Sequence, residues 1–111
     1  MMIRLIVPNT VSENHTVLVY GPEIASLAGG FTATQASGGW LSGKHFLVVE
    51  SVTVFDCYAI PDGNICVKFY SLAQRIAREL AQDCIYLSID GNVEFVKPEN
   101  PSIPAIVREA R

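Results

Sequence analysis

The hydrophobic pattern of the chain changes its period near residue 60, and this change limits the folds that are possible. Residues 46–58 alternate with period two, as a β-strand with two distinct faces does. From about Val67 the apolar residues recur at i, i+3, i+4 and i+7, which predicts an amphipathic helix packed on a sheet. Its apolar stripe consists of Phe69, Leu72, Ala73, Ile76, Ala77 and Leu80.

Shorter runs fill in the remaining elements. Residues 3–7, 16–20, 31–36, 84–89 and 93–96 favour strands by their β-branched and apolar content. Pro22 fits the first turn of a short helix that ends at Gly29-Gly30, and Asp90-Gly91 is typical of a two-residue hairpin turn. The segment around Trp40, with glycines on either side, is predicted to be the irregular arm of a hairpin.

This order of elements predicts an α+β fold. The simplest arrangement is a ferredoxin-like sandwich: an antiparallel sheet with helices on one face, the other face open, and an added C-terminal β-hairpin. We expect residues 1–97 to form one domain. Residues 98–111 are a Pro-rich C-terminal tail, expected to be an extended arm that docks on a neighbour.

The composition argues for a covered apolar surface and against several classes of partner. Half of the residues are hydrophobic and only 17% are charged, against about 25% charged in an average domain. This pattern favours a homodimer or a higher homo-oligomer formed through the open sheet face. The net charge is −3 and no Lys/Arg run exists, which argues against binding to duplex nucleic acid or to a membrane surface.

The cysteines and the N-terminus point to the cytoplasm. Cys57, Cys66 and Cys84 are too widely spaced for CxxC metal or redox chemistry, and their odd number fits a reducing compartment. The apolar run at residues 5–7 is too short for a signal peptide or a membrane span. We therefore expect a cytoplasmic protein with no metal site and no cofactor.

The two faces of the strand at residues 46–58 differ in charge. The charge-free face is predicted to lie under the helices; it carries Leu47, Val49, Ser51, Thr53, Phe55 and Cys57. On the other face Glu50 stands among apolar side chains, and a buried carboxylate is uncommon without cause. Glu50 is therefore a candidate ligand-binding carboxylate or general base. The alternative is an interface glutamate paired with an arginine such as Arg4.

A mechanism with two carboxylates on this strand is excluded by distance. Asp56 shares the face of Glu50 but lies six residues away, which is about 20 Å along a strand. Acid and base carboxylates stand about 5–10 Å apart. Any site around Glu50 must therefore draw its other groups from elsewhere.

Trp40, Thr32 and Gln82 are the other candidate binding residues. Trp40, the only tryptophan, could stack on a planar ligand or anchor a partner, although a lone Trp more often closes the end of a core. Thr32 offers a hydroxyl near the same hairpin, and Gln82 an amide at the end of the long helix. His15 and His45 form no ligand cluster, and the glycines match no phosphate-binding motif.

Several of these residues also form a pattern that resembles a group of known proteins. Gly30-Phe31-Thr32, Gly39-Trp40 and Val49-Glu50, followed by an amphipathic helix that closes on Gln82-Asp83, resemble a loose group of small uncharacterised proteins from bacteria, phages and mobile elements. The likeness covers roughly residues 29–96, and Asp83 stands where the group more often has Glu. It implies a ferredoxin-like fold, an accessory gene product, and a cluster formed by Thr32, Trp40, Glu50 and Gln82. It implies no activity.

Two functional hypotheses follow. The first is a non-enzymatic accessory protein, of mobile-element or phage type, that binds a host protein or a small ligand near Trp40. The second is a small cofactor-independent enzyme, similar to an oxygenase or isomerase, with Glu50 as general base in a pocket lined by Trp40. The absence of a catalytic constellation in the sequence favours the first.

Overall fold

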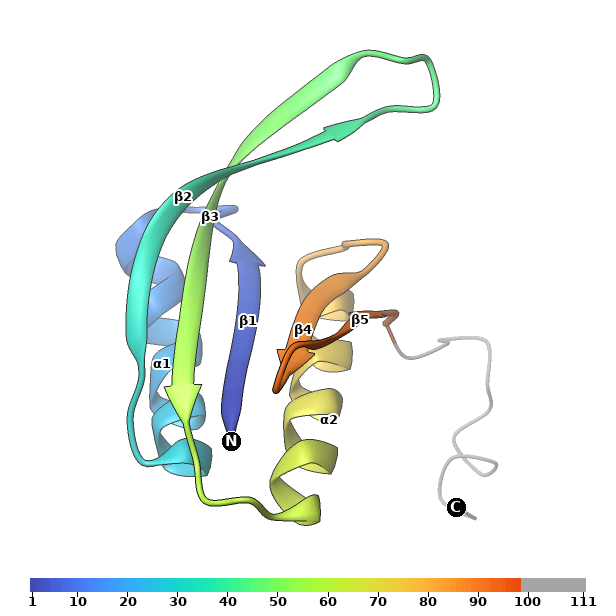
Figure 1. The fold of residues 1–111 in the computed structure, drawn as a ribbon. Coiled ribbons are helices and arrows are strands. Elements are labelled where there is room, and N and C mark those ends of the chain that lie inside the picture. Colours follow the sequence, from blue (N-terminus) through green and yellow to red (C-terminus); the bar gives the residue numbers. More distant parts are fainter. Residues whose placement is uncertain (99–111) are drawn as a thin grey trace, which may run out of the picture.

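Five strands and two helices make up the part of the chain that the computed structural model describes, residues 1–98. The strands form one antiparallel sheet in the order β2-β3-β1-β4-β5, and both helices lie on one side of it (Figure 1). The elements are β1 (Met2–Pro8), α1 (Glu13–Ala28), β2 (Thr32–Leu41), β3 (Leu47–Tyr58), α2 (Gly63–Glu79), β4 (Ile85–Ile89) and β5 (Asn92–Val96). This confirms the ferredoxin-like α+β fold with an added C-terminal hairpin. The predicted tail lies, from residue 99 on, outside the described residues.

The core lies between the sheet and the helices, as the two hydrophobic periods predict. In β1 every second residue is buried, and these side chains face the apolar stripe of α2. Asp62 caps α2, because its Oδ1 accepts a hydrogen bond from the Asn64 backbone N–H at 2.9 Å. The largest fully buried side chains are Phe55, Phe69, Ile3, Leu5, Ile24, Leu72, Ile76 and Ile85.

The first helix begins nine residues earlier than the sequence predicts. The predicted strand at residues 16–20 is wrong: these residues lie inside α1, which runs from Glu13 through Pro22. Ser12 caps the helix by accepting a hydrogen bond from the His15 N–H at 3.0 Å. Thr16, Tyr20 and Ile24 recur at intervals of four residues and are buried. This tertiary burial outweighs the β-propensity of the segment.

The hairpin of β2 and β3 extends well beyond the rest of the sheet. β1 pairs with β3 only along residues 52–58, whereas β2 follows β3 to its first residue, with Leu41 opposite Leu47. We call the overhanging part, residues 37–50, the arm; it crosses above the end of β1 (Figure 1). The predicted irregularity around Trp40 is therefore wrong, since the ladder is regular there.

The arm also corrects the predicted burial of β3. Thr53, Phe55 and Cys57 lie under the helices and are almost fully buried, as predicted. Leu47 and Val49, on the same face, are 68% and 62% exposed. The cause is that the helices cover the body of the sheet and not the arm.

Candidate functional site

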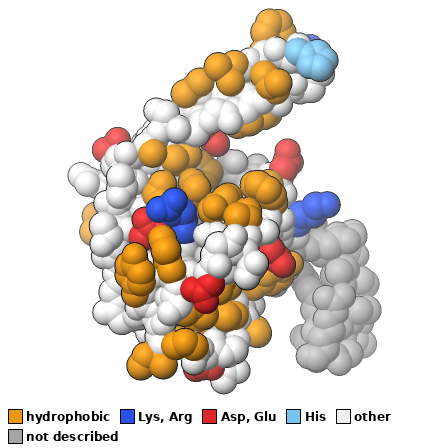
Figure 2. All heavy atoms as spheres, in the orientation of Figure 1, with side chains coloured by type: hydrophobic (Ala, Val, Ile, Leu, Met, Phe, Trp, Pro, Cys, Tyr) orange, Lys and Arg blue, Asp and Glu red, His pale blue; other side chains and the backbone are white. Residues whose placement is uncertain are grey.

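A hollow of about 240 Å³ lies beneath the arm, on the sheet face away from the helices. The arm contributes Trp40 and Glu50, and the connection from α2 to β4 contributes Gln82. Its full lining is Ile6, Pro8, Gly38, Gly39, Trp40, Glu50, Val52, Gln82, Cys84, Ile85, Tyr86 and Phe95. Figure 2 shows hydrophobic side chains along the arm and on the body below it. We call this space the arm hollow.

The ladder between β2 and β3 places Trp40 and Glu50 on one face. Glu50 pairs with Gly38, and Trp40 pairs with Val48. Trp40 and Glu50 are therefore diagonal cross-strand neighbours, about 7–8 Å apart. A Cβ at Gly38 would come within 3.3 Å of Cγ1 of Val52, so a larger residue there would crowd the Val52 side chain.

Glu50 is half-buried, and its carboxylate has no hydrogen bond or ion pair within residues 1–98. The alternative pairing with Arg4 is wrong. The Arg4 guanidinium instead binds Asp56, with Nε 2.7 Å from Oδ1, and this ion pair raises the pKa of Arg4. Glu50 is thus free to interact with a ligand.

Gln82 reaches the arm hollow from the end of α2. Ala81 adopts a left-handed conformation with φ 53°, which turns the chain out of the helix. The Gln82 Nε2 donates a hydrogen bond to the Leu80 carbonyl at 3.1 Å. This contact holds the half-buried amide at the wall of the arm hollow.

Thr32 does not belong to this cluster. It lies opposite Asp56 at the other end of the hairpin, six residues from Gly38, or about 20 Å along the strand. Thr32 is exposed and lines a separate hollow beside Gly29 and Gly30. The structure therefore brings together Trp40, Glu50 and Gln82 and separates Thr32 from them.

Two aromatic residues of the arm hollow escaped the sequence reasoning. Tyr86 and Phe95 pair across β4 and β5, with ring centroids 6.0 Å apart in an edge-to-face contact. The Asp90-Gly91 turn fixes this register and could have revealed the pair. What the sequence could not show is that the arm reaches across to them.

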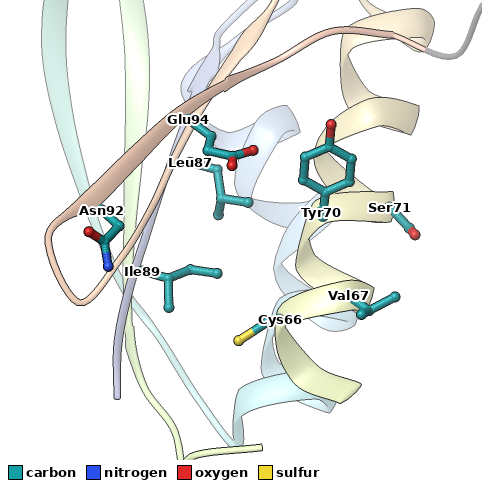
Figure 3. A pocket seen from close by; sticks show the side chains of 8 residues that line it. All are labelled: Cys66, Val67, Tyr70, Ser71, Leu87, Ile89, Asn92 and Glu94. Carbon is teal, nitrogen blue, oxygen red and sulfur yellow. The ribbon is translucent and has the colours of Figure 1, made fainter. Parts of the chain in front are cut away.

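Another hollow, of about 370 Å³, lies on the helix side of the sheet (Figure 3). Its walls are α2 and the β4–β5 hairpin, and its lining is Cys66, Val67, Tyr70, Ser71, Leu87, Ile89, Asn92 and Glu94. Its only carboxylate, Glu94, is exposed to solvent, where water screens charge. Glu50 is less exposed than Glu94 and lines its hollow together with Trp40 and Gln82, so the arm hollow is the better candidate for chemistry.

The described residues show neither a metal cluster nor a membrane span. No group of three or more His, Cys, Asp and Glu residues within residues 1–98 is placed to hold a metal ion. Neither α1 nor α2 is long and apolar enough to cross a membrane.

Comparisons with known proteins give a likeness of fold. No protein-family model and no curated protein matches the chain. A solved structure, a phage SAM lyase in complex with S-methyl-5'-thioadenosine, matches with a TM-score of 0.62 at 12% sequence identity. The match covers 88% of this chain and 89% of the lyase chain.

This likeness corrects the functional expectation. The sequence favours a non-enzymatic binding protein, but the solved structure that shares the fold along most of both chains is an enzyme. The finding contradicts the first hypothesis and favours the second in its general form, a small enzyme. The sequence carries no recognisable catalytic motif, and for this reason it favours a binding protein.

Proposed function

We propose that the chain is a lyase that binds a sulfonium compound in the arm hollow and breaks one of its carbon–sulfur bonds. The substrate we propose is S-adenosylmethionine, and the released thioether is S-methyl-5'-thioadenosine. The observation that carries the proposal is the half-buried Glu50 carboxylate, which lacks a partner within residues 1–98 and stands diagonal to Trp40. The likeness of fold to a SAM lyase supports the choice of substrate.

The lining of the arm hollow fits a sulfonium cation. A carboxylate in a partly dehydrated space attracts a cation more strongly than it does in water. An indole face adds about 0.5–2 kcal/mol of cation–π attraction. The rings of Tyr86 and Phe95 supply the apolar surface that an adenosine moiety needs.

Two reaction routes would break this carbon–sulfur bond, and Glu50 has a different role in each. In an elimination, Glu50 takes a proton from the carbon next to the one that bears sulfur; a C=C bond forms and sulfur leaves with the bonding pair. In an internal displacement, the carboxylate of the substrate attacks the carbon that bears sulfur, and a lactone forms without proton loss. Glu50 then acts only as a counter-ion. The four-carbon product, an unsaturated amino acid or a lactone, identifies the route.

We also propose that the chain self-associates through the arm and the open sheet face. The arm hollow, at about 240 Å³, is smaller than the roughly 300–1,000 Å³ of ordinary ligand sites. The arm exposes large apolar side chains, among them Leu41 and Phe46. A second copy that packs on the arm would cover these side chains, and where it reaches the face of Trp40 and Glu50 it would also close the arm hollow.

The test is to incubate the purified full-length chain with S-adenosylmethionine and to measure S-methyl-5'-thioadenosine by chromatography. We expect product from the unmodified chain and a loss of about 100-fold in kcat/KM for Glu50→Gln. Glu94→Gln, the same change in the hollow of Figure 3, is the control and should keep full activity. An unmodified chain without turnover, or equal losses in both variants, would refute the proposal.

A further inference from the structure

The arm leaves the body of the sheet at a cluster of four polar side chains. The ladder between β1 and β3 ends where Pro8 meets Val52, and beyond that level the ladder between β2 and β3 continues without a third strand. A two-stranded ribbon on its own twists and bends easily. The side chains at this level, which we call the base cluster, are Asn9, Gln35, Ser51 and Thr53.

The base cluster joins the loop after β1 to both strands of the hairpin. Asn9 Nδ2 lies within hydrogen-bond distance of Gln35 Oε1, at 2.9 Å, and of Ser51 Oγ, at 2.8 Å. Thr53 Oγ1 lies 2.7 Å from Asn9 Oδ1 and 3.0 Å from Gln35 Oε1. The Asn9 backbone N–H also donates to the Ser51 carbonyl at 2.9 Å.

The position of Thr53 makes it the central member of this cluster. Its side chain is fully buried and points to the helix side of the sheet, opposite to the face that carries Glu50. A threonine hydroxyl has one hydrogen to donate, so Asn9 and Gln35 compete for it. The cluster lies at the level where the hairpin loses its third strand, so its bonds brace the hairpin where the arm begins.

We infer that Thr53 and Asn9 are positioning residues: they fix the angle of the arm and so hold Trp40 and Glu50 over the arm hollow. Without the Thr53 hydroxyl, the hairpin loses a buried side-chain contact that ties it to the loop after β1. A misplacement of about 1 Å at a site costs on the order of 100-fold in rate. The effect on catalysis rests on the proposed function, whereas the effect on the arm does not.

Trp40 reports the arm position directly, because it is the only tryptophan and lies on the arm. We expect Thr53→Val to shift the Trp40 emission to the red and to increase its quenching by acrylamide, with secondary structure by circular dichroism unchanged. Valine has the shape of threonine. The acceptors that lose the Thr53 hydroxyl are Gln35 Oε1, in an exposed residue, and Asn9 Oδ1, in a half-buried one, so the fold should survive. Thr53→Ser keeps the hydroxyl and should restore the spectrum.

Two further variants make the result specific. Thr34→Val is the same change on the opposite face of the hairpin, where the Thr34 side chain makes no hydrogen bond within residues 1–98, and it should leave the spectrum unchanged. Asn9→Asp removes the two Nδ2 contacts and should reproduce the red shift, which keeps the test decisive if Thr53→Val does not fold. An unchanged Trp40 spectrum in folded Thr53→Val, or an equal shift in Thr34→Val, would overturn the inference.

The same proteins separate this inference from the proposed function. S-methyl-5'-thioadenosine is titrated into each variant, and we expect Thr53→Val to bind about tenfold more weakly than the unmodified chain. If the unmodified chain binds none, the proposed function fails while the Trp40 spectra still decide the role of the base cluster. If it binds and Thr53→Val binds equally well, the base cluster has no positioning role.

Discussion

The buried thiol of Cys57 gives the protein a defined response to high pH. Cys57 is 2% exposed beside the helices, and this burial, with a smaller contribution from Asp56, raises the pKa of the thiol from 9.0 to about 11. The unfolded thiol ionises at the lower pH, so its contribution to stability is fully present below about pH 9. It is lost as the pH rises from about 9 to about 11, and it amounts to about 2–3 kcal/mol.

Urea unfolding at pH 8 and at pH 10.5 measures this contribution. The free energy of unfolding of the unmodified chain should fall more between these values than that of Cys57→Ala. Burial also raises the pKa of Tyr20, so the readout is the difference between the two proteins and not the fall itself. Equal falls in both would show that the thiol titrates alike in the folded and unfolded chains.

At the level of single residues, the period-two rule found most of the candidate site. It placed Glu50 on the face away from the helices, and the ladder adds Trp40 to that face. Thr32 lies opposite Asp56 on the neighbouring strand. The distance along the strand that excludes Asp56 as a partner of Glu50 therefore excludes Thr32 as well. The same arithmetic, applied to both strands of the predicted hairpin, removes Thr32 from the cluster.

Among the secondary-structure elements, α1 approaches the Phe31 ring closely at Gly21. A Cβ at Gly21 would lie 2.9 Å from Cζ of Phe31, whose ring packs edge to face on Phe55 with centroids 5.3 Å apart. We expect Gly21→Val to lower the free energy of unfolding by about 1–3 kcal/mol through overpacking. Chemical denaturation measures this loss.

A double-mutant cycle identifies the cause of that loss. In a Phe31→Ala background the space is open, so Gly21→Val should cost less there. Ser26→Val, at an exposed position of α1, is the control for the helix propensity of valine. A cost for Gly21→Val that does not change with Phe31 would contradict steric contact as its source.

The two helices differ in how far the sequence reveals them. In α2 the buried positions are apolar and recur with the helical period, so the pattern alone predicts the element. In α1 the buried stripe includes Thr16 and Gly21, and exposed Leu18 and Val19 lie between its members. Local propensity therefore indicates a strand, and only packing on β3 and Phe31 decides for the helix.

For the whole molecule, the projection of the arm is the feature that sequence reasoning could not supply. It depends on where β1 stops relative to β3, a pairing between segments more than 40 residues apart. The same hairpin in a sheet with a longer first strand would have no overhang. The arm hollow exists because of this mismatch in strand length, and so does the exposed apolar surface of the arm.

That surface leads to a prediction about assembly. Leu41, Phe46 and Leu47 are 65%, 69% and 68% exposed on the arm, and large exposed apolar patches mark interfaces. We expect the unmodified chain to sediment as a dimer or larger oligomer. The double variant Phe46→Ser/Leu47→Ser should sediment as a monomer with unchanged circular dichroism.

The control is Val67→Ser, which removes an apolar side chain that is 65% exposed on α2 and should leave the assembly intact. If a second copy completes the arm hollow, the monomeric variant also loses binding of S-methyl-5'-thioadenosine, although Glu50 and Trp40 are retained. An unmodified chain that is monomeric at high concentration would contradict self-association, and a monomeric variant with full binding would show that one copy forms the whole site.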